Sequence, residues 1–167
     1  MPDIIFRIIG NDTRIGAKKL SYLQYLEKKY KLKEHGGNII FEGHQDQNYV
    51  KKALQEADIL VHPSRMENHP IALLEAMGHG LPIMCFAVGG IPEIVDNGEN
   101  GILIEPYNVE KFSQALFALI KDKETLTKFS KACLQKAEQF SMKKHIKKLE
   151  AIYKDVLNIH GKKQSKN

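Results

Sequence analysis

The sequence predicts an α/β protein, a Rossmann-like three-layer domain with a mostly parallel five-stranded sheet and two helices at its carboxyl end. Two observations predict this class. Short apolar runs alternate with longer amphipathic stretches, and after the fifth run only helical patterns remain. No linker, internal repeat or low-complexity tract divides the chain, so we expect one domain over residues 1–160 and a disordered basic tail over residues 161–167.

The strands are predicted by runs of four to six residues that are rich in Ile, Leu, Val and Phe and are bounded by Gly, Asp or Pro. Such runs are typical of strands buried on both faces of a parallel sheet. In chain order they are Ile4 to Ile9, Asn38 to Phe41, Ile59 to His62, Pro82 to Phe86 and Gly101 to Ile104.

The helices are predicted by apolar residues that recur three or four positions apart. Leu20, Leu23 and Leu26 indicate the first helix, and Phe112 and Leu116 lie on the stripe of the fourth. The four crossover helices are expected over Lys18 to Tyr30, Gln47 to Ala57, Ile71 to His79 and Val109 to Lys121. Two more follow the last strand, over Lys123 to Gln139 and over Met142 to about Ile159.

The charge is concentrated at one end of the chain. The 167 residues carry 25 Lys and Arg against 20 Asp and Glu, a formal charge of +5. The segment from Ser141 to Asn167 holds eight lysines against Glu150 and Asp155, a net +6, which leaves the rest of the chain near neutrality. Because the body is neutral, we expect no nucleic acid partner.

Composition also bears on the cellular compartment. The two cysteines, Cys85 and Cys133, have no CxxC spacing and are too few for a disulfide framework, which favours a reducing cytosol. The chain has no apolar run of about 18 residues and its start does not resemble a signal peptide. We therefore expect a cytoplasmic protein.

The stretch from Ala57 to Glu93 contains the candidate chemistry. A polar loop over residues 63–70 follows a buried strand and precedes a helix, so it lies at the carboxyl edge of the sheet, where open α/β sheets bind ligands. Glu67 in this loop and Glu75 in the helix can both face one crevice. The first amides of the helix would supply donors for a phosphate or a sugar oxygen, and a carboxylate suits a pair of vicinal hydroxyls.

Simpler interpretations remain open for each of these residues. A Glu near the start of a helix is commonly a solvated partner of the helix dipole. His62, His69 and His79 raise the question of a metal, but no acidic residue completes a ligand pattern, so no metal is expected. The absence of GxGxxG disfavours a dinucleotide-binding oxidoreductase.

Taken together, the ordered motifs resemble glycosyltransferase family 4, the retaining, nucleotide-sugar-dependent enzymes of GT-B fold that are also called group 1 glycosyltransferases. The resemblance runs from about Ile4 to the final helix. The residues that carry it are Ala57-Asp58, Pro63-Ser64, Glu67 with seven residues to Glu75-Ala76-Met77, Gly80-Leu81-Pro82, Gly89-Gly90, Pro92-Glu93, Asn97-Gly98 and Gly101.

The resemblance implies roles for the two glutamates and for the turn between them. Glu75 matches the second Glu of the E-x7-E motif, which holds the ribose hydroxyls of the donor nucleotide. Glu67 matches the first, which lies by the transferred sugar and is the candidate catalytic residue. The turn whose amides approach the sugar and diphosphate is formed here by Asn68, His69, Pro70 and Ile71. The family commonly has Gly-Phe-Gly at its start, and Pro70 removes one backbone donor.

Further donor-binding residues are implied by position. Gly43 and His44 match the loop beside the nucleobase, Gly10 matches a glycine that ends an earlier strand, and Gly90 matches a loop that faces the interdomain cleft. The donor substrate would be a nucleoside diphosphate sugar. As a GT-B enzyme, the protein would need no metal or cofactor.

The chain departs from the family at its front. Family members have an earlier strand with a Gly-Arg-Leu and Lys-Gly loop that binds the diphosphate, and an amino-terminal domain that binds the acceptor. Without that strand, the sheet either closes up, with Ile4 to Ile9 beside Ile59 to His62, or has its gap filled by another chain. The resemblance thus implies an incomplete site, and neither Arg7, Arg14 nor Arg65 occupies an equivalent place.

We therefore expect the donor-binding half of a retaining hexosyltransferase that acts on a glycan or lipid-linked acceptor in cell-envelope polysaccharide synthesis, with little or no activity alone. The alternative is an inactive fragment or split-enzyme subunit that serves as a binding or assembly module. In either case the expected partner is an amino-terminal acceptor-binding domain, in trans or missing from this chain. The basic last helix suits that domain or an anionic membrane at its inner face, although a solvated helix face explains most of its lysines equally well.

Overall fold

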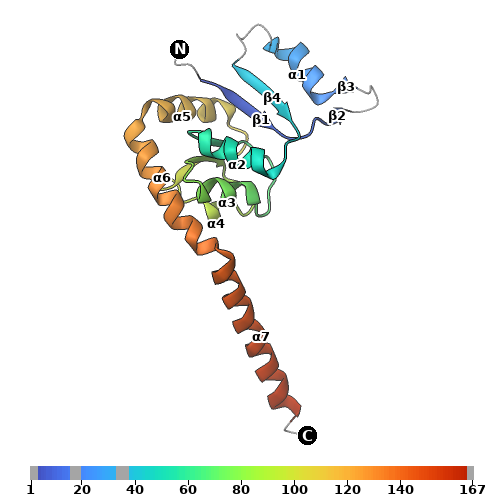
Figure 1. Ribbon diagram of the computed structural model, residues 1–167, viewed down its shortest axis with the longest axis vertical. Coiled ribbons are helices and arrows are strands. Elements are labelled where there is room, and N and C mark those ends of the chain that lie inside the picture. The colour runs from blue at the N-terminus through green and yellow to red at the C-terminus, as the bar shows by residue number, and fades with distance from the viewer. Residues whose placement is uncertain (1–3, 16–19, 33–37, 165–167) are drawn as a thin grey trace. The chain divides into compact units, whose positions relative to one another are not determined.

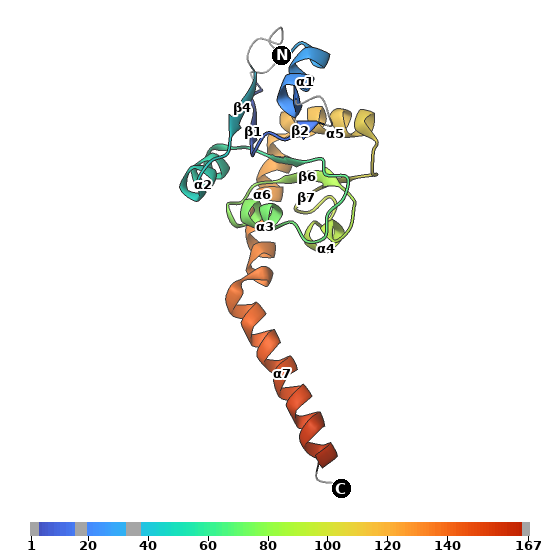
Figure 2. The same cartoon turned by 90° about the vertical axis from the view of Figure 1, so that its right-hand side faces the viewer.

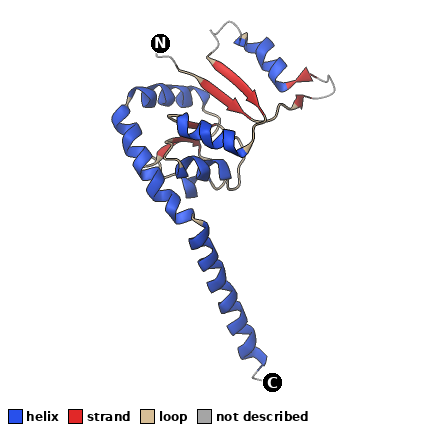
Figure 3. Cartoon of the chain, viewed as in Figure 1, coloured by secondary structure: helices blue, strands red, loops and turns tan. Residues whose placement is uncertain are grey.

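The computed structural model describes residues 4–15, 20–32 and 38–164, and it divides into two compact units, Met1–Gln55 and Glu56–Asn167 (Figure 1). Both units contain strands and helices, as the secondary-structure colouring of Figure 3 shows. The α/β class and the parallel pairing of the predicted strands are confirmed. The single domain expected over residues 1–160 stays a prediction.

The first unit is built on a pair of parallel strands. β1 (Phe6–Ile9) pairs with β4 (Ile39–Gly43), and the short strands β2 (Arg14–Ile15) and β3 (Leu20–Ser21) form an antiparallel pair between them in sequence. Two helices complete the unit, α1 (Tyr22–Tyr30) and α2 (Gln47–Glu56).

The first helix begins later than its apolar spacing predicts. Ser21 caps α1, because its hydroxyl accepts a hydrogen bond from the Gln24 N–H at 3.0 Å while the Gln24 side chain accepts one from the Ser21 N–H at 3.2 Å. The helix therefore starts at Tyr22 rather than at Lys18, which lies outside the described residues.

The strands of the first unit are only partly buried. Phe6 and Ile8 of β1 retain 39% and 46% of their accessible surface, so the prediction of burial on both faces is wrong for this strand. A ladder of only two strands offers too little surface for helices to cover both faces. Across this ladder Arg7 Nε lies 2.7 Å from Glu42 Oε1, so Arg7 is occupied by a structural ion pair.

The second unit is a three-layer sandwich. Its parallel sheet has the order β5 (Leu60–His62), β6 (Ile83–Phe86), β7 (Gly101–Ile104). Figure 2 shows α3 and α4 on one side of β6 and β7 and α5 on the other. The helices are α3 (Ile71–Gly78), α4 (Ile91–Ile94), α5 (Val109–Lys121), α6 (Lys123–Ala137), the 3-10 helix η3 (Glu138–Phe140) and α7 (Met142–Gln164).

The central strand β6 separates two hydrophobic clusters. Its side chains alternate, so Ile83 and Cys85 pack in one cluster with residues of α3, α4 and α6, while Met84 and Phe86 pack in the other with residues of α5. All four residues of β6 are buried, as predicted for a strand covered on both faces. The five predicted strands form two hydrogen-bonded groups, the pair β1 and β4 and the trio β5, β6 and β7.

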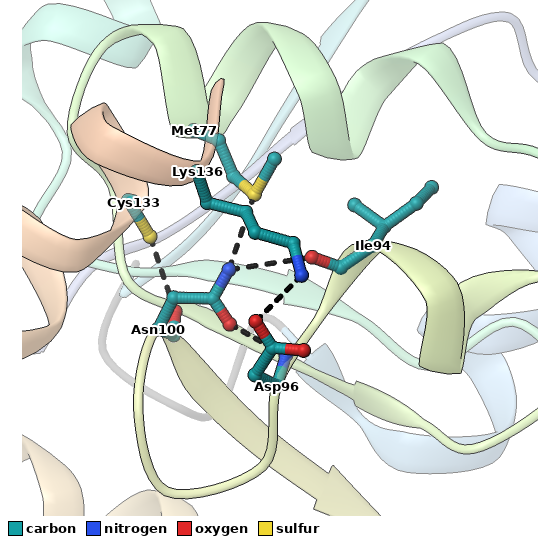
Figure 4. A network of polar contacts seen from close by, with 6 residues as sticks. All are labelled: Met77, Ile94, Asp96, Asn100, Cys133 and Lys136. Atoms are coloured by element: carbon teal, nitrogen blue, oxygen red, sulfur yellow. Dashed lines mark hydrogen bonds and ion pairs between the residues drawn. The ribbon is translucent and has the colours of Figure 1, made fainter. Parts of the chain in front are cut away.

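A buried asparagine ties the trio to its helices. Asn100 is 1% exposed, and its side-chain amide donates to the Ile94 carbonyl at 3.3 Å and accepts from the Asp96 N–H at 2.8 Å. The same amide lies 3.3 Å from the Met77 sulfur of α3, and the Cys133 thiol of α6 donates to the Asn100 carbonyl at 3.1 Å. Figure 4 shows the whole network, formed by Met77, Ile94, Asp96, Asn100, Cys133 and Lys136.

Both cysteines are free and buried. Burial raises the pKa of the Cys85 thiol to about 12, and burial does the same for Cys133. Both thiols are therefore protonated at neutral pH.

The last helix exposes an apolar stripe. Every side chain from Met142 to Leu157 is exposed, and seven of them are large and apolar, namely Met142, Ile146, Leu149, Ile152, Tyr153, Val156 and Leu157. Their spacing of three and four residues places them on one face. The helix continues to Gln164, past the expected end near Ile159, and the last three residues of the predicted tail lie outside the described part.

Within residues 4–15, 20–32 and 38–164, no helix has the length and hydrophobicity to cross a membrane.

Candidate functional site

The loop over residues 63–70 presents Glu67 at the carboxyl end of β5. His62 is the last residue of that strand, and its Nε2 lies 3.0 Å from Glu67 Oε1. The two side chains are 22% and 25% exposed, so the carboxylate is partly open to solvent. The contact fixes the carboxylate and leaves its second oxygen available to a ligand.

The turn at Gly89-Gly90 supports the backbone of this loop. Both glycines follow β6, the neighbour of β5, and the Gly90 N–H donates to the Asn68 carbonyl at 3.0 Å. A Cβ atom at Gly89 would lie 1.7 Å from the Glu67 carbonyl oxygen, and one at Gly90 would lie 2.1 Å from the Asn68 oxygen. Gly89 also has a φ of +52°, which side chains rarely adopt. Only glycine fits this turn, which brings Gly90 against the loop that carries Glu67 and Asn68.

Helix α3 begins directly after the loop with free amide groups. Pro70 is its buried N-cap residue and supplies neither a side-chain cap nor an N–H. The Leu73 N–H donates back to the Pro70 carbonyl at 3.1 Å, whereas among the described residues no acceptor meets the N–H of Ile71 or Ala72. Two donors at the positive end of a helix can bind an anionic group.

Glu75 lies on the same helix and is exposed. Within the described part of the chain, its carboxylate makes no hydrogen bond or ion pair, so it is free to bind a ligand. Its backbone carbonyl accepts from both the N–H and the Nδ1 of His79, at 3.2 and 2.8 Å. The structure thus places Glu75 on the helix that follows Glu67.

His69 and Arg65 of the loop each lie near an aromatic ring. The His69 ring lies 6.0 Å from the Phe140 ring of η3, and the Arg65 guanidinium lies 5.8 Å from the ring centre of Tyr107. In the described ranges, no three His, Cys, Asp or Glu side chains cluster in a way that could hold a metal. The expectation that no metal is needed stays a prediction.

Three predicted site residues belong to the first unit. Gly10 directly follows β1 and Gly43 ends β4, and the Gly10 N–H donates to the Gly43 carbonyl at 2.9 Å. His44 follows and is exposed. The structure therefore brings these glycines together at the carboxyl edge of their own ladder.

Sequence reasoning missed two contributors. The sequence indicates His62 only as a candidate metal ligand, because its contact with Glu67 depends on how the loop folds back over the strand end. Gly89 belongs to a motif of the family resemblance, but its approach to the Glu67 carbonyl follows from the pairing of β5 with β6. The loop that carries Glu67 runs directly into the start of α3 with its N–H donors, and a carboxylate acceptor with amide donors suits a polyhydroxylated, anionic ligand.

Comparison with known proteins supports this chemistry. The model of a family described as "Glycosyl transferases group 1" matches residues 1–136. A curated relative, the UDP-Gal:alpha-D-GlcNAc-diphosphoundecaprenol alpha-1,3-galactosyltransferase of Escherichia coli, is 30% identical over 158 residues, which are 94% of this chain and 38% of the relative. The chain likewise spans well under half of other curated relatives that it matches.

Solved structures agree with the fold. The C-terminal domain of the group 1 glycosyl transferase LpcC from Francisella tularensis is 28% identical with a TM-score of 0.64, over 71% of this chain and 61% of that one. Anabaena Alr3699/HepE in complex with UDP is 21% identical with a TM-score of 0.72, over 83% of this chain and 37% of that one. The Rossmann-like architecture is therefore shared with both.

Proposed function

Because the chain belongs to the group 1 glycosyl transferases, we propose that it is the donor-binding half of a retaining enzyme. The complete enzyme transfers a hexose from a nucleoside diphosphate sugar to a glycan or lipid-linked acceptor in cell-envelope polysaccharide synthesis. The name of the Escherichia coli relative, with its UDP-linked sugar and its diphosphoundecaprenol acceptor, supports this choice of substrates.

The observation that carries the proposal is the juxtaposition of Glu67 with the start of α3. Glu67, held by His62 at 3.0 Å, binds a hydroxyl of the transferred sugar, and Glu75 binds the ribose hydroxyls. The free N–H groups of Ile71 and Ala72 meet the diphosphate. Negative charge grows on the diphosphate as the sugar departs, so donors placed there favour the transition state.

The family resemblance assigns the remaining donor contacts. Asn68, His69 and Pro70 form the turn beside the sugar, and Gly90 supports it. In the first unit, Gly10, Gly43 and His44 lie beside the nucleobase. The UDP complex of Anabaena Alr3699/HepE supports a nucleotide ligand for this fold.

The chain binds its donor but transfers little or no sugar alone. It spans 38% of the Escherichia coli relative. The acceptor-binding domain and the cations that bind the diphosphate are expected in the part of such an enzyme that this chain does not span. An alternative is a split-enzyme subunit or an inactive fragment that acts as an assembly module. Copurification with a second polypeptide that supplies the acceptor domain favours the split enzyme, and sugar transfer by the purified chain alone contradicts the incomplete site.

Calorimetric titration tests the donor site. UDP-, GDP- and ADP-sugars are titrated into the wild-type chain, Glu75→Ala and Glu124→Ala, the last replacing an exposed glutamate in the first turn of α6. We expect one donor class to bind, the Glu75 variant to lose about tenfold in affinity, as for a hydrogen bond to a charged group, and the Glu124 control to bind as the wild type does. Equal binding by all three proteins contradicts the assignment.

We propose in addition that α7 contacts the inner face of an anionic membrane. Between Met142 and Leu157 the helix carries the exposed apolar stripe together with five lysines against Glu150 and Asp155. Basic amphipathic helices bind anionic lipid through both features. The other expected partner of this stripe is the acceptor-binding domain.

A liposome assay separates these two partners. We expect the chain to sediment with vesicles of 30% phosphatidylglycerol and not with phosphatidylcholine vesicles, and we expect added salt to weaken binding because it screens the lysines. Leu149→Glu, within the stripe, should abolish sedimentation, whereas Ala151→Glu, on the opposite side of the helix, should reduce it less. No sedimentation at low salt rejects the membrane proposal.

A further inference from the structure

We propose that His62 is a positioning residue that sets the orientation of the Glu67 carboxylate toward the donor sugar. The inference rests on the proposed function, because it assigns a purpose to a neighbour of the residue that binds the sugar. Its starting observation is the 3.0 Å contact between His62 Nε2 and Glu67 Oε1.

The two partners differ in how firmly they are held. His62 lies within β5, where it pairs with Cys85 of the fully buried strand β6, so its backbone is fixed by the sheet. Glu67 lies in a loop. The Gly89-Gly90 turn supports the backbone of this loop but does not fix the Glu67 side chain. The imidazole thus supplies the constraint that the loop lacks.

The geometry leaves one carboxylate oxygen for the ligand. A neutral imidazole with its proton on Nε2 donates to Oε1, and Oε2 has no partner among the described residues. Glu67 is about a quarter exposed, so a sugar hydroxyl can reach that oxygen. His62 is itself mostly covered and would act through Glu67 rather than touch the sugar.

A positioning role makes a prediction that simple support of the fold does not. Loss of the imidazole donor should weaken binding of the nucleoside diphosphate sugar while leaving binding of the matching nucleoside diphosphate unchanged, because only the sugar meets Glu67. A residue that merely stabilises the loop would weaken both ligands together, since the loop also leads into the amides of α3.

The test uses two amides of different reach. In His62→Gln the side-chain N–H can occupy the place of Nε2, whereas in His62→Asn the same group is too short to reach Glu67. UDP-glucose, GDP-mannose and ADP-glucose are each titrated against UDP, GDP and ADP, with urea midpoints measured for every variant. We expect His62→Asn to lose about tenfold in affinity for the sugar nucleotide alone, and His62→Gln to retain affinity within about threefold of the wild type.

The outcomes separate this inference from the donor site. If Glu67→Ala loses discrimination between sugar nucleotide and nucleotide but His62→Asn keeps it, the positioning role is wrong and the donor site stands. Equal losses for both ligands in His62→Asn, or no rescue by His62→Gln, also overturn the positioning role. If Glu67→Ala changes nothing, or the wild type binds none of the ligands, the proposed function fails and the inference fails with it.

Discussion

Gly89 approaches the Glu67 carbonyl so closely that no side chain fits there. In Gly89→Ala the new Cβ would lie 1.7 Å from that oxygen at a φ of +52°, so the loop and its carboxylate must move. We expect a loss of more than about 2 kcal/mol in the free energy of unfolding, from the strained φ and the displaced loop together. Urea denaturation of the wild type and of Gly89→Ala measures this loss.

Gly98 offers a matched control for this substitution. Its φ is +80°, but a Cβ there would meet no atom within 4 Å. Gly98→Ala should therefore cost only the backbone strain, about 1 kcal/mol. Equal losses at the two positions would contradict the close approach at Gly89.

The amide of Asn100 is the polar centre of the second unit. In Asn100→Ala the part-buried Asp96 N–H and the buried Ile94 carbonyl lose their partner. We expect the free energy of unfolding to fall by about 2 to 4 kcal/mol, because unpaired buried polar groups keep their full desolvation penalty. Asn97→Ala removes an exposed acceptor from the Leu103 N–H and should cost about 1 kcal/mol in the same denaturation experiment. A smaller loss at Asn100 than at Asn97 would rule out this account.

At the scale of one element, α6 depends on its cap. The Thr125 hydroxyl donates to Asp122 Oδ2 at 2.6 Å and the Thr125 N–H donates to Oδ1 at 2.9 Å, and these bonds lower the pKa of Asp122 below its ordinary value of 3.8. A folded-state pKa below the unfolded one means that the stabilisation is present above pH 3.8 and is lost as pH falls through the folded value.

Comparison with an uncharged cap isolates this effect. Asp122→Asn keeps a capping oxygen without the titrating charge. We expect the wild type to have the higher urea midpoint at pH 6 and the difference to shrink as the pH falls below 3.8. Thr125→Val should flatten the pH dependence, because it removes the largest cause of the shift. A difference that stays constant between pH 6 and pH 3 would refute the cap's contribution.

How far the sequence predicts an element depends on whether the element has local signals. Val109–Lys121 is helical over the predicted range, because the capping Asn108 and a continuous apolar stripe mark it. The β2–β3 pairing was not predicted, since strands of two residues show no alternation. Helix α6 ends at Ala137 rather than Gln139 because a 3-10 turn follows, and Phe140 of that turn packs against the hydrophobic core.

The same distinction applies to the site. The order of Glu67, the helix start and Glu75 is local in sequence, so the spacing indicates it. The contact of Gly89 with the Glu67 carbonyl spans two strands and the approach of His62 depends on the fold of one loop. Neither has a periodic or compositional signature, and so neither could be predicted.

At the scale of the whole molecule, the two units differ in burial. β6 is buried throughout and is bonded to a strand on each side, whereas Phe6 and Ile8 of β1 are exposed. Ala53 is the one buried hydrophobic residue of the first unit among those described. Elements with few buried contacts open at lower free energy.

Hydrogen exchange followed by mass spectrometry tests this difference. We expect amides of β1 and β4 to exchange at least about tenfold faster than amides of β6, as local opening requires less free energy than global unfolding. Peptides from α5, which packs in the second cluster, provide the reference for a protected helix. Equal protection in β1 and β6 would show that the first unit is as stable as the second.

The burial of the two cysteines makes each of them a native reporter of opening. A thiol whose pKa is about 12 reacts negligibly with a disulfide reagent at pH 7 until its surroundings open and it ionises as an exposed thiol does. The labelling rates of Cys85 and Cys133 therefore time the opening of β6 and of α6 separately. For the same reason, a cysteine introduced on the exposed surface of α7 could carry a fluorophore or spin label without removal of the native pair.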